Sequence, residues 1–378
     1  MKKILTIIGA RPQIIKAAAI SRAIKNNFKD KLTEVLVHTG QHYDENMSKI
    51  FFEELGIPKP NYQLAIGSGS HGAQTGKMLI EIEQILLDEK PDGIVVYGDT
   101  NSTIAGSLAA VKLHIPVIHI EAGLRSFNKK MPEEINRIAT DHFSTLLFSP
   151  TSSGLKNLTK EGFSDKTEGV ARLGAPHVFH CGDIMYDNSM YFSGIADEKS
   201  NILNTYNLKE NQYILSTVHR PSNTDDATNL KAILEGLLEI ATENKVKVVF
   251  PIHPRTKAKI SELISPEFFK NCQEQILFIP PVSFLDIIKL EKYAQILMTD
   301  SGGVQKEAYF FKKKCVILRE ETEWVEIVNE NAATCVGADK AKMIAAYNNL
   351  MNSECNFSSI FGDGKASEFI CEKIIETI

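Results

Sequence analysis

The 378-residue sequence contains no apolar run of the roughly 18 residues that a transmembrane helix needs, so no segment is expected to insert into a membrane. The apolar run at residues 4–8 meets Gly9 and Arg11 and is too short to act as an export signal. Basic residues are not in excess, because the formal net charge is −5. This charge argues against nucleic acid as the main partner.

Cysteine is also scarce. Six cysteines are scattered along the chain without a C-x-x-C pair, so their spacing predicts neither a metal site nor a disulfide framework. Reduced thiols and a cytoplasmic location are the simplest interpretation. The turn after the first apolar run lacks the pattern G-x-G-x-x-G, which disfavours a dinucleotide-dependent redox enzyme.

What is present is a repeated alternation of short apolar runs with longer amphipathic stretches. Hydrophobic residues make up 43% of the chain, and its length favours two domains over one. The alternation predicts the α/β class, with two doubly wound domains whose parallel sheets are covered on both faces. The predicted strands are residues 4–8, 35–38, 93–97, 117–120, 146–148, 213–218, 246–252, 276–279, 296–299, 315–318 and 334–336, and the predicted helices include 15–24, 76–87, 102–113, 227–242, 284–290, 303–311 and 367–377.

A polar, glycine-containing region at about 165–205 predicts the junction between the domains. We therefore assign residues 1–185 to an N-terminal domain and residues 186–361 to a C-terminal domain. The tail, about 362–378, has apolar residues at helical spacing. Its packing partner stays open, and packing back on the N-terminal domain is one of the two options.

Polar residues follow nearly every predicted strand, at the edge where open parallel sheets bind their ligands. Turns and helix caps use the same residue types, so each motif alone is a weak signal. Together they predict two rims of acids, histidines and arginines. The strand ends read Gly9-Ala10-Arg11-Pro12-Gln13, Thr39-Gly40-Gln41-His42, Gly98-Asp99-Thr100, Glu121-Ala122-Gly123-Leu124-Arg125, His219-Arg220-Pro221 and Asp300-Ser301-Gly302-Gly303.

The most informative stretch is residues 118–137. Glu121 closes an apolar run and needs a partner, for which Arg125 and Arg137 are the candidates. A helix predicted from Pro132 carries Glu133 in its first turn, where an acid also simply complements the helix dipole. Acids and arginines gathered at one strand end suit proton transfer beside an anionic, phosphate-bearing ligand.

Other candidate residues also have structural interpretations. Asp99 would serve as a cap for the helix that follows it, and His219, beside Arg220, as a core or capping histidine. Arg11 and Lys16 lie where the turn after the first strand would meet a diphosphate. For the lysine, a surface position is an equal alternative.

The turn Ser301-Gly302-Gly303 leads into a predicted helix. Its backbone N–H groups suit a phosphate or diphosphate, but a plain turn with Ser301 as N-cap fits equally well. Glu307, one helical turn further on, has the position to accept two ribose hydroxyls. An exposed helix carboxylate is the simpler interpretation of that residue.

Taken in order, six motifs resemble those of the non-hydrolysing UDP-N-acetylglucosamine 2-epimerases, and the similarity covers nearly the whole chain. The motifs are Gly9-Ala10-Arg11-Pro12-Gln13-Ile14-Ile15-Lys16, Thr39-Gly40-Gln41-His42, Gly98-Asp99-Thr100, His119-Ile120-Glu121-Ala122-Gly123-Leu124-Arg125, Pro132-Glu133-Glu134-Ile135-Asn136-Arg137 and Asp300-Ser301-Gly302-Gly303-Val304-Gln305-Lys306-Glu307.

The resemblance implies two Rossmann-like domains with an interdomain cleft of the GT-B type, a homodimer, a UDP-sugar substrate, and no metal or redox cofactor. By motif position it implies catalytic roles for Asp99, Glu121, Glu133 and His219, and nucleotide-binding roles for Arg11, Lys16, Ser301, Gly302, Gly303 and Glu307. Gln41, His42, Arg125, Arg137 and Arg220 complete the predicted substrate-binding set.

Two features resemble a subgroup that acts on UDP-2,3-diacetamido-2,3-dideoxyglucuronate, namely Gln13 and the stretch 321–326. The commoner family pattern has Glu at position 13 and Arg-Pro in place of Trp324-Val325. Ser222 departs from the family, in which many members carry Glu. The substrate therefore stays open between this sugar and UDP-GlcNAc, which would give UDP-ManNAc.

The expected reaction inverts C2 by elimination of UDP to a 2-acetamidoglucal and its re-addition, for surface polysaccharide precursors. A hydrolysing 2-epimerase that releases ManNAc and UDP is one alternative. A GT-B glycosyltransferase and a non-catalytic nucleotide-sugar sensor are the others.

Overall fold

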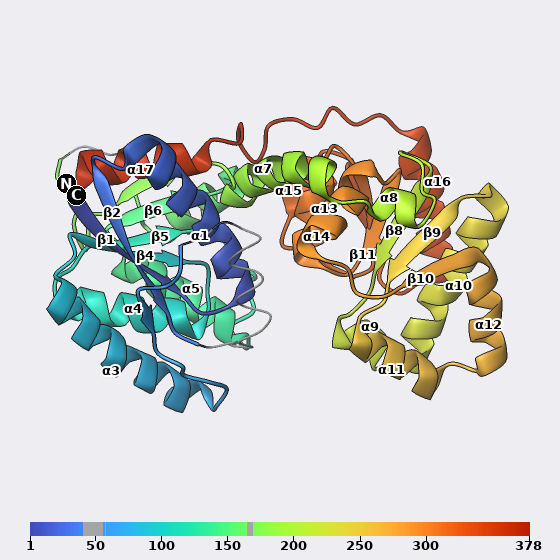
Figure 1. Cartoon of the computed structure of the whole chain (residues 1–378), viewed down its shortest axis with the longest axis horizontal. Helices are drawn as coiled ribbons and strands as arrows, with labels where there is room; N and C mark the ends of the chain where they lie inside the picture. Colours follow the sequence, from blue (N-terminus) through green and yellow to red (C-terminus); the bar gives the residue numbers. More distant parts are fainter. Residues whose placement is uncertain (41–55, 57, 165–168) are drawn as a thin grey trace. The chain divides into compact units, whose positions relative to one another are not determined.

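The computed structural model describes residues 1–40, 56, 58–164 and 169–378 (Figure 1). The chain divides into two compact units, one formed by Met1–Asn188 with Ser359–Ile378 and the other by Ser189–Ser358. Each unit has its own parallel sheet, with helices between successive strands. The predicted α/β class with two parallel sheets is confirmed. None of the helices in the described part of the chain has the length and apolar character needed to cross a membrane.

The N-terminal unit is built on a seven-stranded sheet in the order β3-β2-β1-β4-β5-β6-β7. Its strands are β1 (Lys2–Ile8), β2 (Leu32–His38), β3 (Tyr62–Gln63), β4 (Gly93–Tyr97), β5 (Val117–Ile120), β6 (Leu146–Ser149) and β7 (His177–His180). Its helices are α1 (Arg11–Ala23) with the π-helical extension η1 (Ile24–Phe28), α3 (His71–Glu89), α4 (Asn101–Lys112), α5 (Pro132–Phe143), α6 (Ser152–Lys160) and α17 (Ala366–Thr377).

Helices cover both faces of this sheet. The central strands therefore carry apolar side chains on both faces. Helices α3 and α4 lie on one face, while α1 and α17 lie side by side on the other (Figure 1). Met78 and Ile82 of α3 pack with Ala105 and Ala109 of α4 against the strand side chains, including the buried Val96. This packing leaves only the strand ends available for polar chemistry.

The C-terminal unit is built on a six-stranded sheet in the order β10-β9-β8-β11-β12-β13. Its strands are β8 (Tyr213–Thr217), β9 (Lys247–Pro251), β10 (Ile276–Ile279), β11 (Ile296–Thr299), β12 (Lys314–Ile317) and β13 (Ala333–Cys335). Its helices are α8 (Ile202–Thr205), α9 (Pro221–Thr224), α10 (Ala227–Asn244), α11 (Pro254–Leu263), α12 (Pro266–Gln275), α13 (Phe284–Tyr293), α14 (Gly302–Phe310), α15 (Val325–Asn329) and α16 (Lys340–Asn352). The division between the units falls within α7 (Ile184–Lys199).

Both sheets contain one point at which the strand order reverses. In the N-terminal unit it lies between β1 and β4, and in the C-terminal unit between β8 and β11. Helices leave these two neighbouring strands towards opposite faces, and the carboxyl ends of the strands open a crevice there that binds ligands in doubly wound folds. The turns that follow these four strands are therefore the first places to look for a site.

The structure also contains elements that the sequence did not predict. Strands β3 and β7 are short and flanked by polar residues, so neither stands out as an apolar run. The region expected to be irregular contains β7 and the 16-residue helix α7. Helix α17 lies within the N-terminal unit, where the N–H groups of Ala366 and Ser367 donate to the Asp187 carboxylate at 3.1 and 2.7 Å.

Candidate active site

At the reversal point of the N-terminal sheet, one buried side chain joins two strand ends. The Oε1 atom of Gln13 accepts from the backbone N–H groups of Gly9 and Ala10 at 2.9 and 3.2 Å. Its Nε2 group donates to the carbonyl oxygen of Tyr97 and to the hydroxyl of Thr100, both at 2.9 Å. A glutamate at position 13 would have no N–H group for the Tyr97 carbonyl, so glutamine matches this local geometry.

The turn after β4 bears Asp99, whose carboxylate forms an ion pair with Arg137. The Arg137 guanidinium, from α5, donates to the Asp99 carboxylate, and Asn136 donates to the Asp99 carbonyl oxygen at 3.0 Å. Asp99 is not the cap of the next helix, because the Thr100 side chain occupies that position and accepts from the N–H of Thr103. The Asp99 side chain is therefore held by an arginine and remains 26% exposed.

Glu121 lies close to the same turn. Its carboxylate pairs with the ammonium group of Lys16, whereas the sequence pointed to Arg125 or Arg137 as the partner. A Cβ placed on Gly98 would lie 3.2 Å from Glu121 Oε2 and 3.7 Å from Lys16 Nζ. The structure thus brings Lys16, Glu121 and the turn that bears Asp99 together.

The backbone at Glu121 is strained. Its φ angle is +72°, in the left-handed region that L-residues with side chains avoid. Such a conformation costs about 1–3 kcal/mol and persists only where the surroundings impose it. Part of that surrounding is Gly123, at φ +79°, where an added Cβ would lie 2.4 Å from the carbonyl oxygen of Gly154.

The two acids at the start of α5 have different environments. Glu134 is 1% exposed and accepts from the N–H groups of Ser126 and Phe127, both at 2.9 Å, and from Arg137 at 2.7 Å. Burial would raise the pKa of Glu134, but these donors outweigh it and hold the pKa below its usual value. Glu133, in contrast, is exposed. Glu134 therefore fixes the loop and Arg137, and Glu133 offers an accessible carboxylate.

Arg125, predicted to bind substrate, is engaged with two carboxylates of its own unit. Its guanidinium donates to Asp141 at 2.6 Å and to both carboxylate oxygens of Glu161 at 2.7 and 2.6 Å. Burial would lower the pKa of Arg125, but these carboxylates raise it above its usual value. With 1% of its side chain exposed, Arg125 supports the turn that follows Glu121.

In the C-terminal unit, Asp300 organises the reversal point. This fully buried carboxylate follows β11 and accepts from the N–H of His219 at 3.1 Å, from the N–H of Arg220 at 3.0 Å and from the Asn223 amide at 3.0 Å. The His219 ring atom Nδ1 lies 3.4 Å from Asp300 Oδ1, and its side chain is 47% exposed. Asp300 thus holds an accessible histidine at the end of β8.

The turn into α14 leaves its backbone accessible. Ser301 occupies the N-cap position of this nine-residue helix, but its side chain makes no capping hydrogen bond to the described residues. A Cβ added at Gly302 or Gly303 would lie 3.6 or 3.9 Å from the nearest described atom, which is ordinary contact. The fold itself therefore does not require glycine at either position.

The stretch 321–326 packs beside this turn. The Trp324 indole N–H donates to the carbonyl oxygen of Gly302 at 2.9 Å, and Lys306 Nζ lies 4.2 Å from the centre of its ring. Arg319 donates to Glu323 at 2.8 Å. Although burial would raise the pKa of Glu323, Arg319 holds that pKa below its usual value. Arg319 therefore favours the charged form of the Glu323 carboxylate next to the glycines.

Glu307, one turn into α14, lies near a second acid that the sequence did not single out. Glu291 on α13 is 1% exposed, and neither of its carboxylate oxygens has a hydrogen-bond partner among the described residues. Burial, and then the negative charge of Glu307, raise the pKa of Glu291 well above its usual value. Burial and the neighbouring Glu307 thus both oppose the ionisation of Glu291.

The remaining predicted site residues have different surroundings. Arg11 is exposed at the first turn of α1, and Arg220 lies 3.9 Å from Glu323. Gln41 and His42 lie outside the described residues. The buried pair of His119 and Asp141 was not predicted, although a histidine inside an apolar strand is a visible signal that a buried partner must exist.

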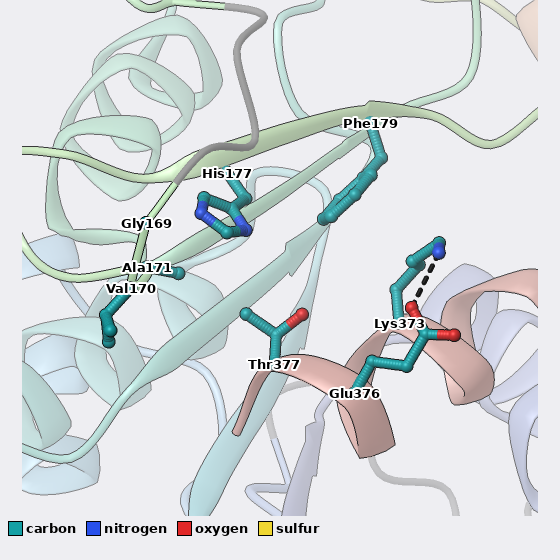
Figure 2. A pocket seen from close by; sticks show the side chains of 8 residues that line it. All are labelled: Gly169, Val170, Ala171, His177, Phe179, Lys373, Glu376 and Thr377. Carbon is teal, nitrogen blue, oxygen red and sulfur yellow. Dashed lines mark hydrogen bonds and ion pairs between the residues drawn. The ribbon is translucent and has the colours of Figure 1, made fainter.

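A separate cavity of about 320 Å³ lies beside β7, an edge strand of the N-terminal sheet. Figure 2 shows the rings of His177 and Phe179, from β7, directed towards the last turns of α17, where Lys373 and Glu376 form an ion pair. Because His177 is the first residue of β7, this cavity lies at the amino end of that strand. It is therefore distinct from the strand-end acids.

Comparison with known proteins places this geometry in context. The family model described as UDP-N-acetylglucosamine 2-epimerase matches residues 24–375. The UDP-2,3-diacetamido-2,3-dideoxy-D-glucuronate 2-epimerase of Pseudomonas aeruginosa is 48% identical over 371 residues, 98% of each chain. The UDP-N-acetylglucosamine 2-epimerase of Methanocaldococcus jannaschii is 45% identical over 97% of each chain.

Solved structures give the same result. The crystal structure of the Methanocaldococcus jannaschii UDP-GlcNAc 2-epimerase in complex with UDP-GlcNAc and UDP has a TM-score of 0.83 to this chain, with 44% identity and 99% of each chain covered. The two chains thus share their full length as well as their fold.

Proposed function

The chain belongs to the UDP-N-acetylglucosamine 2-epimerase family, and we propose that it inverts C2 of a UDP-2-acetamido sugar without hydrolysing it. The observation that carries this proposal is the pair of carboxylates at the N-terminal reversal point. Asp99 is held by Arg137 and Glu121 by Lys16, on neighbouring turns after β4 and β5. These are two groups able to move protons, fixed next to each other.

The chemistry explains why more than one acid is needed. The C2–H bond is not adjacent to a carbonyl group, so the proton is acidified only as the C1–O bond to UDP breaks. One carboxylate takes the C2 proton while the electron pair of that bond forms the C1–C2 double bond and UDP departs. A second acid then protonates C2 on the opposite face while a UDP oxygen re-adds to C1. Asp99, Glu121 and the exposed Glu133 are the candidates for these two roles.

The C-terminal unit supplies the groups that suit the nucleotide. The N-terminus of α14 directs backbone N–H groups and the positive end of a helix dipole towards an anion. His219 and Arg220 follow β8 at the same reversal point, where they would stabilise the charge on the departing diphosphate. Glu307 would accept hydrogen bonds from the ribose hydroxyls.

Because the fold does not require glycine at position 303, we expect Gly303→Ala to weaken UDP binding without destabilising the protein. A methyl group at this point would obstruct the approach of a phosphate to the backbone, and we expect a loss of affinity of roughly 10–100-fold, the equivalent of one lost hydrogen bond to a charged group. Calorimetric titration with UDP measures the affinity, and a thermal melt measures stability.

The matched control is Gly194→Ala on α7, where an added Cβ meets no described atom within 4 Å. It should leave UDP affinity unchanged. Wild-type affinity in Gly303→Ala would contradict the placement of the diphosphate at this turn.

The reaction itself is tested in deuterium oxide, with UDP-GlcNAc and UDP-2,3-diacetamido-2,3-dideoxyglucuronate assayed side by side. We expect one of the two to give both C2 epimers carrying deuterium at C2, measured by proton NMR, with no stoichiometric release of UDP. Free sugar with equimolar UDP would instead indicate a hydrolysing 2-epimerase. An unchanged sugar that nevertheless binds would indicate a sensor, and turnover only with an acceptor a glycosyltransferase.

A homodimer and a cytoplasmic location complete the proposal. Ile80 and Leu87, seven residues apart on α3, are 68% and 49% exposed, and Ile135 on α5 is 56% exposed. Apolar side chains left in water at this spacing favour burial by a second copy. The six cysteines are all free thiols, which fits a reducing compartment.

A further inference from the structure

One histidine of the N-terminal unit lies fully buried between the two turns that bear Asp99 and Glu121. His119 Nδ1 is 2.7 Å from Asp141 Oδ1, and His119 Nε2 is 2.8 Å from the carbonyl oxygen of Gly98. A carbonyl oxygen can only accept a hydrogen bond, and so can an ionised carboxylate. Both ring nitrogens must therefore donate, which makes His119 an imidazolium cation.

The ionised state of Asp141 has its own support. This carboxylate, also fully buried, accepts from the N–H of Gly123 at 3.1 Å and from Arg125 at 2.6 Å in addition to His119. Burial would raise the pKa of Asp141, but its hydrogen bonds and charge interactions with His119 and Arg125 hold it below its usual value. With Glu161 bound to Arg125, the cluster contains two cations and two anions and is neutral overall.

The hydrogen bonds of His119 and Asp141 reach the turns that bear Asp99 and Glu121. His119 donates to the carbonyl of Gly98, the residue directly before Asp99, while Asp141 accepts from Gly123, two residues after Glu121. We propose that His119 and Asp141 are positioning residues for the 2-epimerase reaction, in which the His119 ring, donating from both nitrogens, sets the spacing between Asp99 and Glu121. This inference rests on the proposed function, since it assigns those two acids to proton transfer.

The proposal predicts an effect on rate rather than on nucleotide binding. Proton transfer to and from C2 needs the acids within a fraction of an ångström of their working positions, and a displacement of about 1 Å can cost roughly 100-fold in rate. The strained backbone of Glu121 makes it especially sensitive, because its φ of +72° is kept only while the neighbouring contacts hold. Of the groups assigned to the nucleotide, Ser301, Gly302, Gly303 and Glu307 belong to the other unit. Arg11 and Lys16 belong to this unit, but the hydrogen bonds of His119 and Asp141 are made with other residues.

The first experiment compares Asp141→Asn and His119→Gln with the wild-type enzyme. We expect kcat per UDP-binding site to fall roughly 10–100-fold in both variants, with KM and the dissociation constant for UDP unchanged. Because UDP binding reports mainly on the C-terminal unit, circular dichroism measures the folded fraction of the whole chain beside it, and a variant that merely loses folded protein keeps its kcat per folded site. The matched control is His142→Gln, also on α5, whose ring lies 4.9 Å from that of Phe163 and which should keep the wild-type kcat.

The second experiment needs no variant to be active. In ¹⁵N-histidine NMR of the wild-type protein at about pH 8, where an ordinary histidine of pKa about 6.5 is neutral, the signal lost in His119→Gln should show two protonated ring nitrogens. A neutral tautomer at that pH would overturn the charged state, and a wild-type kcat per site in Asp141→Asn would overturn the positioning role. If the wild-type protein epimerises neither UDP-sugar, the proposed function fails, while the NMR result still reports on the His119–Asp141 pair.

Discussion

Glu121→Gln is expected to lower kcat by about 10²–10⁴-fold, the range in which a positioned general acid or base contributes. The amide preserves the shape of the side chain but neither takes nor returns a proton. Its partner Lys16 would keep a hydrogen-bond acceptor but lose the negative charge. Affinity for UDP should change less than kcat, because only Arg11 and Lys16 of the proposed nucleotide groups belong to the N-terminal unit and the others to the C-terminal unit.

The measurement is the rate of C2 epimerisation by proton NMR, together with the rate at which deuterium enters C2. The control is Glu89→Gln, which also removes an acid paired with a lysine, since Glu89 lies 3.2 Å from Lys3. Lys3 is near the amino end of β1, so this pair is remote from the strand-end turns. Wild-type deuterium exchange in Glu121→Gln would exclude Glu121 as a proton-transfer group and shift the role to Asp99 and Glu133.

Much of the fold follows from the sequence because parallel strands covered on both faces are continuous apolar runs. The run at 93–97 and the β-branched core of β9 are examples, because neither has a polar residue at its centre. Strand β7 was missed because only Val178 and Phe179 are apolar between two histidines. Helix α7 was missed because its hydrophobic residues do not gather on one face.

The candidate site was predictable in outline for the same reason. Ligands bind at the carboxyl ends of the strands in such sheets. The order of the strands therefore predicts which polar turns lie together, even when the directions of the side chains are unknown. The pairing of individual charges was not predictable. Glu121 pairs with Lys16, which lies on α1, the helix that follows β1. Arg125 instead pairs with the buried Asp141. Such choices depend on helix placement to within a few ångströms, which a single sequence does not specify.

Asp300→Ala is expected to be the most damaging single change in the C-terminal unit. It leaves the N–H groups of His219 and Arg220 and the amide of Asn223 without their acceptor, and each such loss costs about 1–3 kcal/mol where water cannot enter. We expect the free energy of unfolding to fall by roughly 3–5 kcal/mol. Because His219 loses the group that orients it, kcat should fall as well.

The chain provides its own probe for this experiment. Trp324 is the single tryptophan, it is 8% exposed, and it lies in the C-terminal unit, so its fluorescence reports urea unfolding of that unit. The matched control is Asp226→Ala, which also removes a carboxylate that accepts from two backbone N–H groups, those of Thr228 and Asn229 at 2.8 and 3.0 Å.

These donors lie in the exposed first turn of α10, where water replaces the lost acceptor, so Asp226→Ala should cost only about 1 kcal/mol. Equal losses in the two variants would show that the Asp300 contacts contribute no more than an ordinary helix cap. A large loss of stability in Asp300→Ala, with kcat per folded site unchanged, would separate the structural role of Asp300 from the orientation of His219.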